Sequence, residues 1–367
     1  MQHFITRGGV IGFVLLGLAA CSNPTPPDIT NIAQATATPT THPTSTPTPA
    51  PTHTPTATST PTRTPTPTPT LNPLNVAWMR QQSYPGSELT IERELAPGPN
   101  YKQYVAAYQS DDNKNYGLLT IPTGAEPSTG WPAIIFNHGY IPASIYSTTD
   151  SYSSHVRSLA RSGYVVFKPD YRGHDDSEGE PRGGYGSPNY TIDVLNAVAA
   201  VKSLPQVDPN RLGMFGHSMG GHLTLRSMVT TNDIKAGVIW AGVVASYPDL
   251  LNNWRRPIPA TVPQQARRWR QELVETYGSP EENPEFWASI SPIAYVADIS
   301  GPLQLHHGTN DADVPIEFSE SLDQAMQAAG RTVEYYLYNG DNHNLLNNWG
   351  TVMRRTIEFF DKYVKGG

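Results

Sequence analysis

Short apolar runs alternate with segments of helical periodicity over most of the chain after residue 130. The apolar runs lie at 133–137, 164–169, 211–215, 236–240, 303–306 and 333–338. The helical patterns between them lie at 155–161, 191–203, 220–229, 317–329 and 351–363. A strand that is apolar on both faces must be covered on both faces. The alternation therefore predicts an α/β fold with a mostly parallel central sheet and helices on both faces.

Two further features frame this alternation. Three strand-like segments separated by turn residues predict a meander at the start of the folded domain, and they lie at 89–95, 101–110 and 116–121. From about residue 247 to 290 the chain shows no strand signal and mixes Trp254 and Trp269 with several arginines. We expect a small helical cap in this interval, inserted after the strand at 236–240, and one folded domain over residues 71–367.

Residues 1–20 have the pattern of an export signal. Arg7 precedes an apolar run at 10–20, and the run ends in Leu18-Ala19-Ala20-Cys21, which resembles the bacterial lipobox. Cys21 is the only cysteine of the chain, and it falls where lipidation needs a thiol. We expect a lipoprotein signal peptide and a lipid anchor at Cys21 that holds the exported protein at the bacterial cell surface or envelope. An ordinary signal peptide with a chance cysteine is the alternative.

Residues 21–70 have a composition that does not support a folded core. The stretch 36–70 consists almost entirely of Thr, Pro, Ala and Ser. Such a tract has few apolar side chains to bury, and each proline removes a backbone donor. We expect a disordered linker that acts as a stalk between the anchor and the folded domain.

Composition and charge exclude several kinds of function. The net charge is −7 and no block of Lys and Arg stands out, which argues against a nucleic-acid partner. A single cysteine excludes an internal disulfide and a cysteine-rich metal site. No apolar stretch is long enough to cross a bilayer as a mature helix.

The segment Gly216-His217-Ser218-Met219-Gly220 fits the Gly-x-Ser-x-Gly nucleophile elbow. In that motif a serine lies on a sharp turn between a strand and a helix, and small neighbours let the two elements approach. Here the segment follows the strand predicted at 211–215 and opens the helix predicted at 220–229. Ser218 is therefore the candidate catalytic nucleophile.

A nucleophilic serine needs a base, and the base needs a carboxylate that orients it. Asp311 and Asp313 follow the strand predicted at 303–306, and we choose Asp311 because it comes first after the Gly-Thr turn. Asp313 would cap the following helix or line the substrate site. His343 is the only histidine after Asp311, so it is the candidate base.

The remaining polar segments are assigned to the support of this site. The oxyanion of the tetrahedral intermediate needs two donors, which we expect from the N–H groups of Met219 and Tyr140, with the Tyr140 hydroxyl as an alternative to its N–H. The stretch 170–177 ends a strand on the same rim and should brace the site by hydrogen bonds. His306 and His307 lack a further ligand at metal spacing, so strand-end packing and turn hydrogen bonds are favoured over a metal site.

With these residues in place, the chain resembles the catalytic domain of the prolyl oligopeptidase family of serine peptidases. The resemblance covers roughly residues 119–363. Its landmarks are Asp170-Tyr171-Arg172-Gly173, Asp208-Pro209-Asn210-Arg211 before the elbow, Ser291-Pro292, and Gly308-Thr309-Asn310-Asp311 with Val314-Pro315. The resemblance implies an α/β-hydrolase fold, and it puts Ser218, Asp311 and His343 on the nucleophile, the acid and the base.

Two departures bear on the substrate. The 367 residues leave no room for the propeller of the larger peptidases, and Asp313 stands where prolyl oligopeptidases place an arginine. We expect a serine hydrolase without a cofactor or metal, acting on a peptide or an acyl ester, with Trp254 and Asp313 as candidate substrate-binding residues. The alternatives to a peptidase are a carboxylesterase on small or polysaccharide-linked acyl esters and, less favoured, a non-catalytic surface binding lipoprotein.

Overall fold

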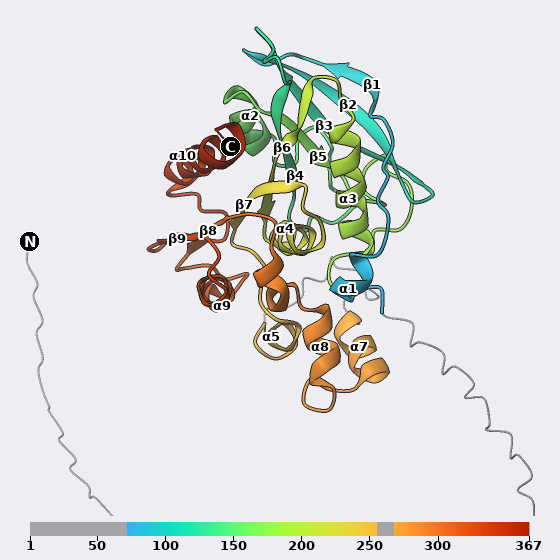
Figure 1. The fold of residues 1–367 in the computed structure, drawn as a ribbon, viewed down its shortest axis with the longest axis vertical. Coiled ribbons are helices and arrows are strands. Elements are labelled where there is room, and N and C mark those ends of the chain that lie inside the picture. The colour runs from blue at the N-terminus through green and yellow to red at the C-terminus, as the bar shows by residue number, and fades with distance from the viewer. Residues whose placement is uncertain (1–71, 255–267, 367) are drawn as a thin grey trace, which may run out of the picture. The chain divides into compact units, whose positions relative to one another are not determined.

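A nine-stranded sheet organises the part of the chain that the computed structural model describes, residues 72–254 and 268–366. Its order is β1-β2-β3-β5-β4-β6-β7-β8-β9. The strands are β1 (Thr90–Leu95), β2 (Tyr101–Ser110), β3 (Asn113–Pro122), β4 (Trp131–Asn137), β5 (Val165–Pro169), β6 (Val207–His217), β7 (Ile234–Trp240), β8 (Leu303–Gly308) and β9 (Val333–Tyr338). The pairs β1–β2, β2–β3 and β3–β5 are antiparallel. The six strands β5, β4, β6, β7, β8 and β9 run parallel to one another. The predicted meander and the mostly parallel sheet are both confirmed (Figure 1).

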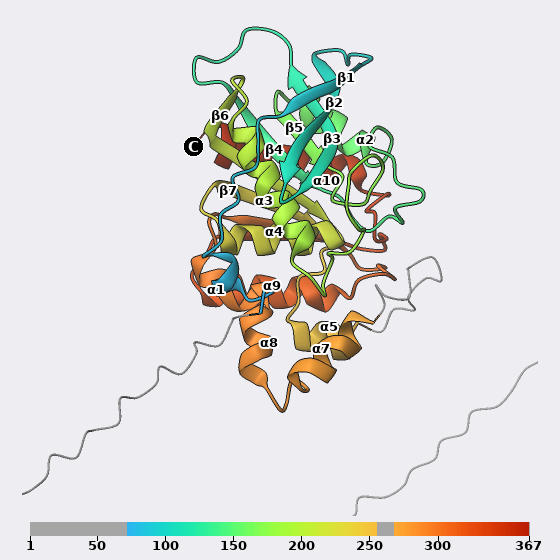
Figure 2. The same ribbon diagram turned by 90° about the vertical axis from the view of Figure 1, so that its right-hand side faces the viewer.

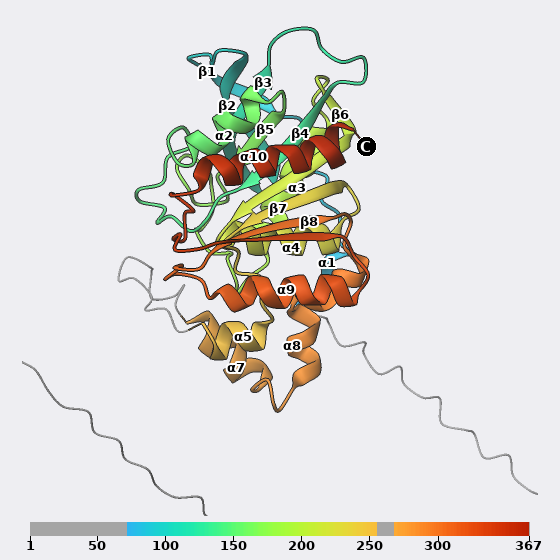
Figure 3. The same ribbon diagram turned by 90° about the vertical axis from the view of Figure 1, so that its left-hand side faces the viewer.

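Helices cover both faces of this sheet, as predicted. One face carries α3 (Asn189–Lys202), α4 (Met219–Thr230) and α9 (Ile316–Ala328), and the other carries α2 (Ser153–Arg161) and α10 (Trp349–Phe360). Figure 2 shows the α3 and α4 side, and Figure 3 shows α2 and α10 in front of the sheet.

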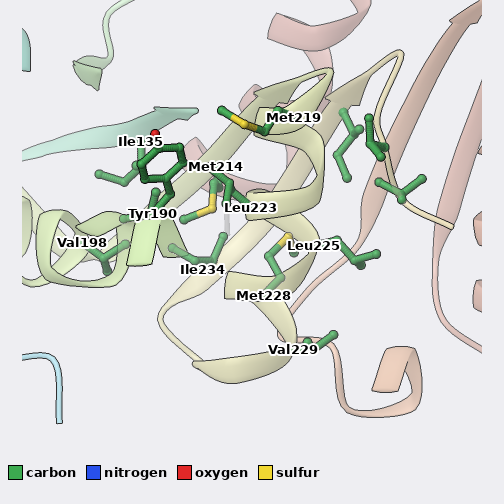
Figure 4. Close-up of a cluster of buried hydrophobic side chains, with 14 of the residues drawn as sticks. Ile135, Tyr190, Val198, Met214, Met219, Leu223, Leu225, Met228, Val229 and Ile234 are labelled. Atoms are coloured by element: carbon green, nitrogen blue, oxygen red, sulfur yellow. The ribbon is translucent and has the colours of Figure 1, made fainter. Parts of the chain in front are cut away.

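The two faces of the sheet have separate hydrophobic cores, because successive side chains of a strand point to opposite faces. Ile135 of β4 belongs to the cluster under α3, α4 and α9, whereas its neighbours Ile134 and Phe136 belong to the cluster under α2 and α10. Figure 4 shows the first cluster, where Met214 of β6 and Leu223 of α4 lie among the side chains between helix and sheet. Burial of these residues fixes α4 against β6, and α4 begins directly after Ser218.

Three helices occupy the described part of the predicted cap. They are α5 (Tyr247–Asn252), α7 (Trp269–Tyr277) and α8 (Pro284–Ile290), and they lie between β7 and β8 in the chain. α8 begins with Asn283, whose side chain accepts the N–H of Phe286, followed by Pro284 at the first helical position. Trp287 is fully buried, so this tryptophan of the insertion is a packing residue.

Some short elements were not predicted. They are the four-residue helix α1 (Val76–Met79) and the 3-10 helix η1 (Pro292–Asp298), whereas the π-helical turn η2 (Asp361–Lys365) continues α10 and overlaps the helix predicted at 351–363. Such short turns have too few residues to show a period in the sequence. The signal peptide expected at 1–20, the lipidation site Cys21 and the linker expected at 21–70 lie outside the described residues. Within the described ranges, no helix combines the length and the hydropathy that a membrane span requires.

Candidate active site

Ser218 lies at a strained turn between β6 and α4. β6 ends at His217 and α4 begins at Met219, so Ser218 alone connects strand to helix. Its backbone has φ 56° and ψ −117°, a conformation that residues with a side chain rarely adopt. The N–H of Ser218 donates to the carbonyl oxygen of Trp240 at 3.0 Å, and this bond ties the turn to the end of β7. The strand, turn and helix that the elbow motif requires are therefore present.

Two glycines allow β6, β4 and α4 to approach each other at this turn. A Cβ added at Gly216 would lie 2.3 Å from the carbonyl oxygen of Gly220, and a Cβ at Gly220 would lie 2.0 Å from the carbonyl oxygen of Asn137. Both close atoms belong to the backbone and cannot rotate away. A side chain at either position would therefore push α4 away from the sheet and displace Ser218.

Asp311 and His343 meet at the carboxyl end of the sheet. Asp311 follows β8 and His343 follows β9, and these two strands are parallel neighbours. Nδ1 of His343 lies 2.8 Å from Oδ2 of Asp311, and their side chains are 11% and 1% exposed. Ser218 and His343 line the same cavity. The structure thus brings the three candidate triad residues to one site.

Hydrogen bonds keep Asp311 charged although it is buried. Burial alone would raise the pKa of Asp311, but the hydrogen bonds from His307 and His343 and from the backbone outweigh burial and lower it well below its usual range. Oδ1 accepts the N–H groups of Asp313 and Val314 at 2.8 and 3.0 Å. Asp311 is therefore a stable carboxylate that can orient the His343 ring and stabilise its charged form.

His307 makes hydrogen bonds at the strand end, as predicted, but its contact with Asp311 was not predicted. Its Nε2 lies 3.1 Å from Oδ2 of Asp311, and its Nδ1 lies 2.7 Å from the hydroxyl of Ser319. Its neighbour His306 points to the other face of β8, where it stacks on Tyr336. The spacing of four residues between His307 and Asp311, across a strand end and a glycine turn, was the signal that could have identified this contact.

Asp341 shapes the loop that carries His343. It is fully buried, and its carboxylate accepts the N–H groups of Asn342, Asn347 and Asn348 at 2.9, 3.1 and 2.9 Å. Although burial would raise the pKa of Asp341, these bonds and the Asn348 side chain lower it. Asp341 therefore orders the whole loop around His343.

Asp313 does not cap the following helix, so that part of the prediction is wrong. The N-cap of α9 is Pro315, and no side chain caps this helix. The main chain turns at Asp311 and leaves Asp313 beside the cavity that Ser218 lines. The carbonyl oxygen of Asp313 accepts the indole N–H of Trp254 at 2.9 Å, so the two candidate substrate-binding residues lie together.

The same acidic residues are a group that could hold a metal ion. Asp311, Asp313 and His343 each offer a ligand atom within 4.8 Å of the others, the one such group found in residues 72–254 and 268–366. However, Nδ1 of His343 is engaged with Asp311, and both oxygens of Asp311 accept hydrogen bonds. The arrangement fits an acid–histidine pair better than a metal site, and the absence of a cofactor stays a prediction.

The two residues expected to supply oxyanion donors, Met219 and Tyr140, line the same cavity as Ser218. Met219 is the first residue of α4, and the first N–H groups of a helix have no acceptor within the helix. Tyr140 follows the end of β4, is 42% exposed and lines the cavity. A Cβ added at Gly139 would lie only 3.2 Å from Cβ of Ser218, so the chain before Tyr140 passes very close to the serine. The oxyanion roles of Met219 and Tyr140 stay predictions.

A buried relay that was not predicted ties three segments of the site together. Nε2 of His217 lies 3.0 Å from the carbonyl oxygen of His343, which can only accept, so Nδ1 accepts the hydroxyl of Tyr152 at 2.7 Å. The Tyr152 hydroxyl in turn accepts the N–H of Gly139 at 3.1 Å. Burial, then the nearby His343, lowers the pKa of His217 to about 3, so His217 stays neutral. The relay joins the oxyanion segment, the elbow and the histidine loop.

Asp170 braces the loop that follows Tyr140, in agreement with the predicted supporting role of stretch 170–177. Its carboxylate accepts the hydroxyls of Tyr146 and Thr148 at 2.6 and 2.5 Å. Lys168 donates to the Tyr146 hydroxyl at 2.7 Å, and all four side chains are buried. The 141–151 loop is thereby fastened to the end of β5.

All of the predicted site residues except Asp311 and the lipidation site line one cavity of about 1110 Å³. Trp269 and Tyr185 also line it, and Tyr185 contacts the Trp254 ring edge-on, with 5.3 Å between ring centroids. The cavity is large enough for a substrate that extends on both sides of the serine.

Comparison with known sequences identifies relatives of this chain. The sequence model of the prolyl oligopeptidase family matches residues 150–367. The uncharacterized peptidase YuxL of Bacillus subtilis (strain 168) is 31% identical over 235 residues, which cover 62% of this chain and 33% of YuxL. The uncharacterized peptidase YtmA of the same strain is 26% identical over 262 residues, which cover 70% of this chain and 92% of YtmA. The matched part is thus about a third of YuxL but nearly all of YtmA.

Solved structures have the same fold. The acylaminoacyl peptidase of Pyrococcus horikoshii matches with a TM-score of 0.58 at 21% identity, over 73% of this chain and 42% of that one. The acetyl xylan esterase from Paenibacillus sp. R4 matches with a TM-score of 0.59 at 17% identity, over 77% of this chain and 91% of that one. Both likenesses establish an α/β-hydrolase fold.

Proposed function

Because this chain belongs to the prolyl oligopeptidase family of serine peptidases, we propose that it hydrolyses acyl bonds through an acyl-enzyme on Ser218. One observation carries the proposal. Ser218 lies on a strained elbow in the same cavity as His343, and His343 is held by the buried carboxylate of Asp311 at 2.8 Å. A serine hydroxyl becomes a nucleophile in this setting, since the histidine can take its proton.

In the proposed mechanism each step uses a residue of the site. His343 takes the proton of the Ser218 hydroxyl as its oxygen attacks the substrate carbonyl carbon. The N–H groups of Met219 and Tyr140 stabilise the oxyanion. His343 then gives its proton to the leaving group as the acyl-enzyme forms. Water, activated by the same histidine, releases the acid and restores Ser218.

A peptide is the substrate class that we favour. Relatives of the chain are peptidases, and a carboxylate near the site supports the binding of a substrate amino group. Asp313 lines the cavity with a carboxylate oxygen within 4.8 Å of the ligand atoms of Asp311 and His343. The aromatic surface of Trp254 lies beside it. We assign Asp313 to a substrate amine and Trp254 to an apolar part of the acyl group.

A carboxylesterase is the second candidate. The acyl-enzyme chemistry is the same, and the observation that favours it is the likeness to the Paenibacillus acetyl xylan esterase, 91% of which the match spans. Small or polysaccharide-linked acyl esters would then be the substrates. The two candidates differ in whether the enzyme can expel an amine, which is a poorer leaving group than an alcohol.

The test compares rates on short-chain nitrophenyl esters with rates on proline and other aminoacyl nitroanilides, for the purified protein and its Ser218→Ala variant. Cleavage of anilides that Ser218→Ala abolishes supports the peptidase. Ester turnover without anilide cleavage makes the protein an esterase. Turnover that survives in Ser218→Ala contradicts the assignment of the nucleophile, and no turnover of either class would favour the binding lipoprotein.

We also propose that the protein is exported and anchored by lipid at Cys21. The lipobox-like end of the apolar run and the use of the single cysteine at that position support this proposal. Replacing Cys21 with alanine should abolish labelling by radioactive palmitate and release the protein from the membrane fraction. Labelling that persists in the variant would contradict the anchor.

A further inference from the structure

The cavity around Ser218 has two arms of different chemistry. The aromatic arm is lined by Tyr185, Trp254 and Trp269, and the Arg270 guanidinium lies over the two indole rings, 5.2 and 4.6 Å from their centroids. The arginine arm is lined by one face of α2 together with the histidine loop and the start of α10, namely by Ser154, Arg157, Ser158, Arg161, Leu346 and Trp349. The aromatic arm contains Trp254, which the proposed function assigns to the acyl group. The arginine arm has no role in that proposal.

The sequence of α2 places both arginines in the cavity. Side chains three, four and seven positions apart lie on one face of a helix. Ser154, Arg157, Ser158 and Arg161 have this spacing, whereas Val156, Leu159 and Ala160 face the core and are fully buried. At 1.5 Å per residue, the lined face from Ser154 to Arg161 is about 10 Å long. This face of α2 therefore forms one wall of the arm over that length.

The two arginines give this arm a positive charge. Both side chains are exposed, and in the described part of the chain no carboxylate lies within ion-pair distance of either guanidinium. Asp150 is the acidic residue that lines this end of the cavity, and its carboxylate accepts the hydroxyl of Ser147 at 2.9 Å. The chain as a whole carries −7, so the positive arm is not a reflection of the average surface.

The arginine arm lies on the leaving-group side of the scissile bond. His343 protonates the leaving group in the proposed mechanism, so the leaving group faces His343. Leu346 and Trp349 of the arginine arm follow His343 in the same segment, and the indole nitrogen of Trp349 lies 3.4 Å from Nε2 of His155 on α2. Met219, in contrast, lies close to the residue that precedes Tyr185 of the aromatic arm, because a Cβ added at Gly184 would lie 3.1 Å from its sulfur.

From this geometry we propose that the arginine arm is a leaving-group subsite for a peptide that carries a carboxylate. The inference rests on the proposed function and specifies its substrate. A leaving peptide of about three extended residues is roughly 10 Å long, which matches the length of the α2 face that carries the two guanidinium groups. Arg157 and Arg161 bind that carboxylate, and Leu346 and Trp349 contact the intervening residues. The carboxylate belongs to the C-terminus or to an acidic side chain of the leaving peptide.

The test uses acetyl as the acyl group, because acetyl is small enough to fit the acyl-group site of a peptidase or an esterase. Acetyl esters of lactyl-glycyl-glycine are compared as the free acid and as the C-terminal amide, which differ in one charge. A third ester carries aspartate in place of the last glycine, with its C-terminus amidated. We expect kcat/KM to be about tenfold higher for at least one carboxylate than for the neutral amide, the size expected of a charged hydrogen-bonded contact at a partly shielded site. The difference should shrink at about 1 M salt, where the screening length is about 3 Å.

Variants then assign the preference to the two arginines. In Arg157→Gln/Arg161→Gln the ratio of acid to amide should fall close to one. Arg354→Gln is the matched control, because Arg354 is an exposed arginine paired with Glu358 on α10 and does not line the cavity. It should leave the ratio unchanged. The ratio is internal to each variant, so a change in the amount of folded enzyme does not alter it.

Binding to Ser218→Ala, measured by calorimetry with the same three esters, decides the inference without turnover. Preference for either carboxylate that is lost with the two arginines supports it, and the two carboxylate esters identify the source of the charge. The inference is overturned if Ser218→Ala binds the acid and the amide with equal affinity. It is also overturned if a preference for the carboxylate survives when both arginines are replaced. If the wild-type protein hydrolyses none of the three esters while Ser218→Ala still binds the carboxylates, the proposed function is contradicted and the subsite stands.

Discussion

Asp311 and Asp170 are two buried carboxylates at the same edge of the sheet, yet their charges are held in opposite ways. Hydrogen bonds lower the pKa of Asp311 well below its usual range, although burial works against them. Burial raises the pKa of Asp170 to about 6, although Lys168 and the hydroxyls of Thr148 and Tyr146 work against burial. Burial is also the main cause that lowers the pKa of Lys168, to about 8.

The difference lies in the donors. Asp311 receives N–H groups from two histidines and two backbone amides, which are in place before any substrate binds. Asp170 receives two hydroxyls and the field of one buried lysine. Fixed N–H donors can hold a charge in a buried site, whereas a few hydroxyls only reduce its cost. Asp311 is therefore suited to support charge on a catalytic histidine, and Asp170 is suited to fasten a loop.

The largest effect is expected from Asp311→Asn. The amide cannot stabilise charge on His343, so kcat should fall by about 10³- to 10⁴-fold with little loss of fold. Asp313→Asn is the control, and its effect should be at most about tenfold and mainly on KM, as expected of a residue that binds substrate. Steady-state kinetics on a nitrophenyl ester measure both. The reverse order of effects would exchange the roles of the two residues.

The next effect is on stability and concerns Asp170→Asn. This change leaves the Lys168 ammonium buried without its carboxylate, which should cost about 3 kcal/mol of unfolding free energy. The double variant Asp170→Asn/Lys168→Met removes both charges and should regain most of that loss. Urea unfolding at neutral pH measures the three proteins. A double variant as unstable as the single one would show that the hydroxyl bonds, and not the charge of Lys168 near Asp170, fasten the loop.

The pH dependence of stability should have opposite signs for the two carboxylates. The folded pKa of Asp170 is raised, so its contribution to stability is greatest below about pH 4 and falls as the pH rises to about 6. The folded pKa of Asp311 is lowered, so its contribution is present above about pH 4 and is lost only in stronger acid. Between about pH 4 and 6, the advantage of the wild type over Asp170→Asn/Lys168→Met should therefore decrease.

Unfolding free energies measured in urea at several pH values test this sign. Above about pH 8 the advantage should rise again, because folded Lys168 loses its proton before the unfolded chain does. If the stability advantage of the wild type over the double variant grows from pH 4 to 6, Asp170 is held charged, as Asp311 is. The two carboxylates would then not differ in how their charge is controlled.

The smallest effect is expected from His307→Gln, which removes one donor to Asp311. The pKa of Asp311 should rise, and kcat should fall by about tenfold, which corresponds to a single hydrogen bond to a charged group. The acid limb of the pH–rate profile should move to higher pH. His306→Gln is the matched control. His306 is the preceding residue of β8 and is equally buried, but it bonds to Gln304 and Tyr338 and not to Asp311. An equal shift in both variants would assign the effect to packing.

Local pattern predicted the sheet, its principal helices and the elbow, because each depends on neighbouring residues. The unbroken apolar run of β4 and the glycines around Ser218 were visible in the chain itself. Chain order also sufficed for His343, which has no competitor after Asp311. The family resemblance placed the same residues on the same roles.

The supporting contacts could not be predicted, because they join residues distant in sequence. The relay from Gly139 through Tyr152 and His217 to His343 depends on where a loop folds back over the sheet. The wrong assignment of Asp313 as a helix cap has a similar origin. A helix that begins after Pro315 needs no acidic cap, and the tight turn at Asp311 directs the next carboxylate to the cavity.

The attachment of the histidine loop has a consequence for how this protein can evolve. His217 binds the backbone carbonyl of residue 343, and Asp341 binds backbone amides of the same loop, so neither attachment uses the imidazole. A mutation that replaced His343 would remove the general base and leave the loop, the cavity and both of its arms in position. A gene copy that lost catalysis in this way would already encode a folded receptor for the former substrate.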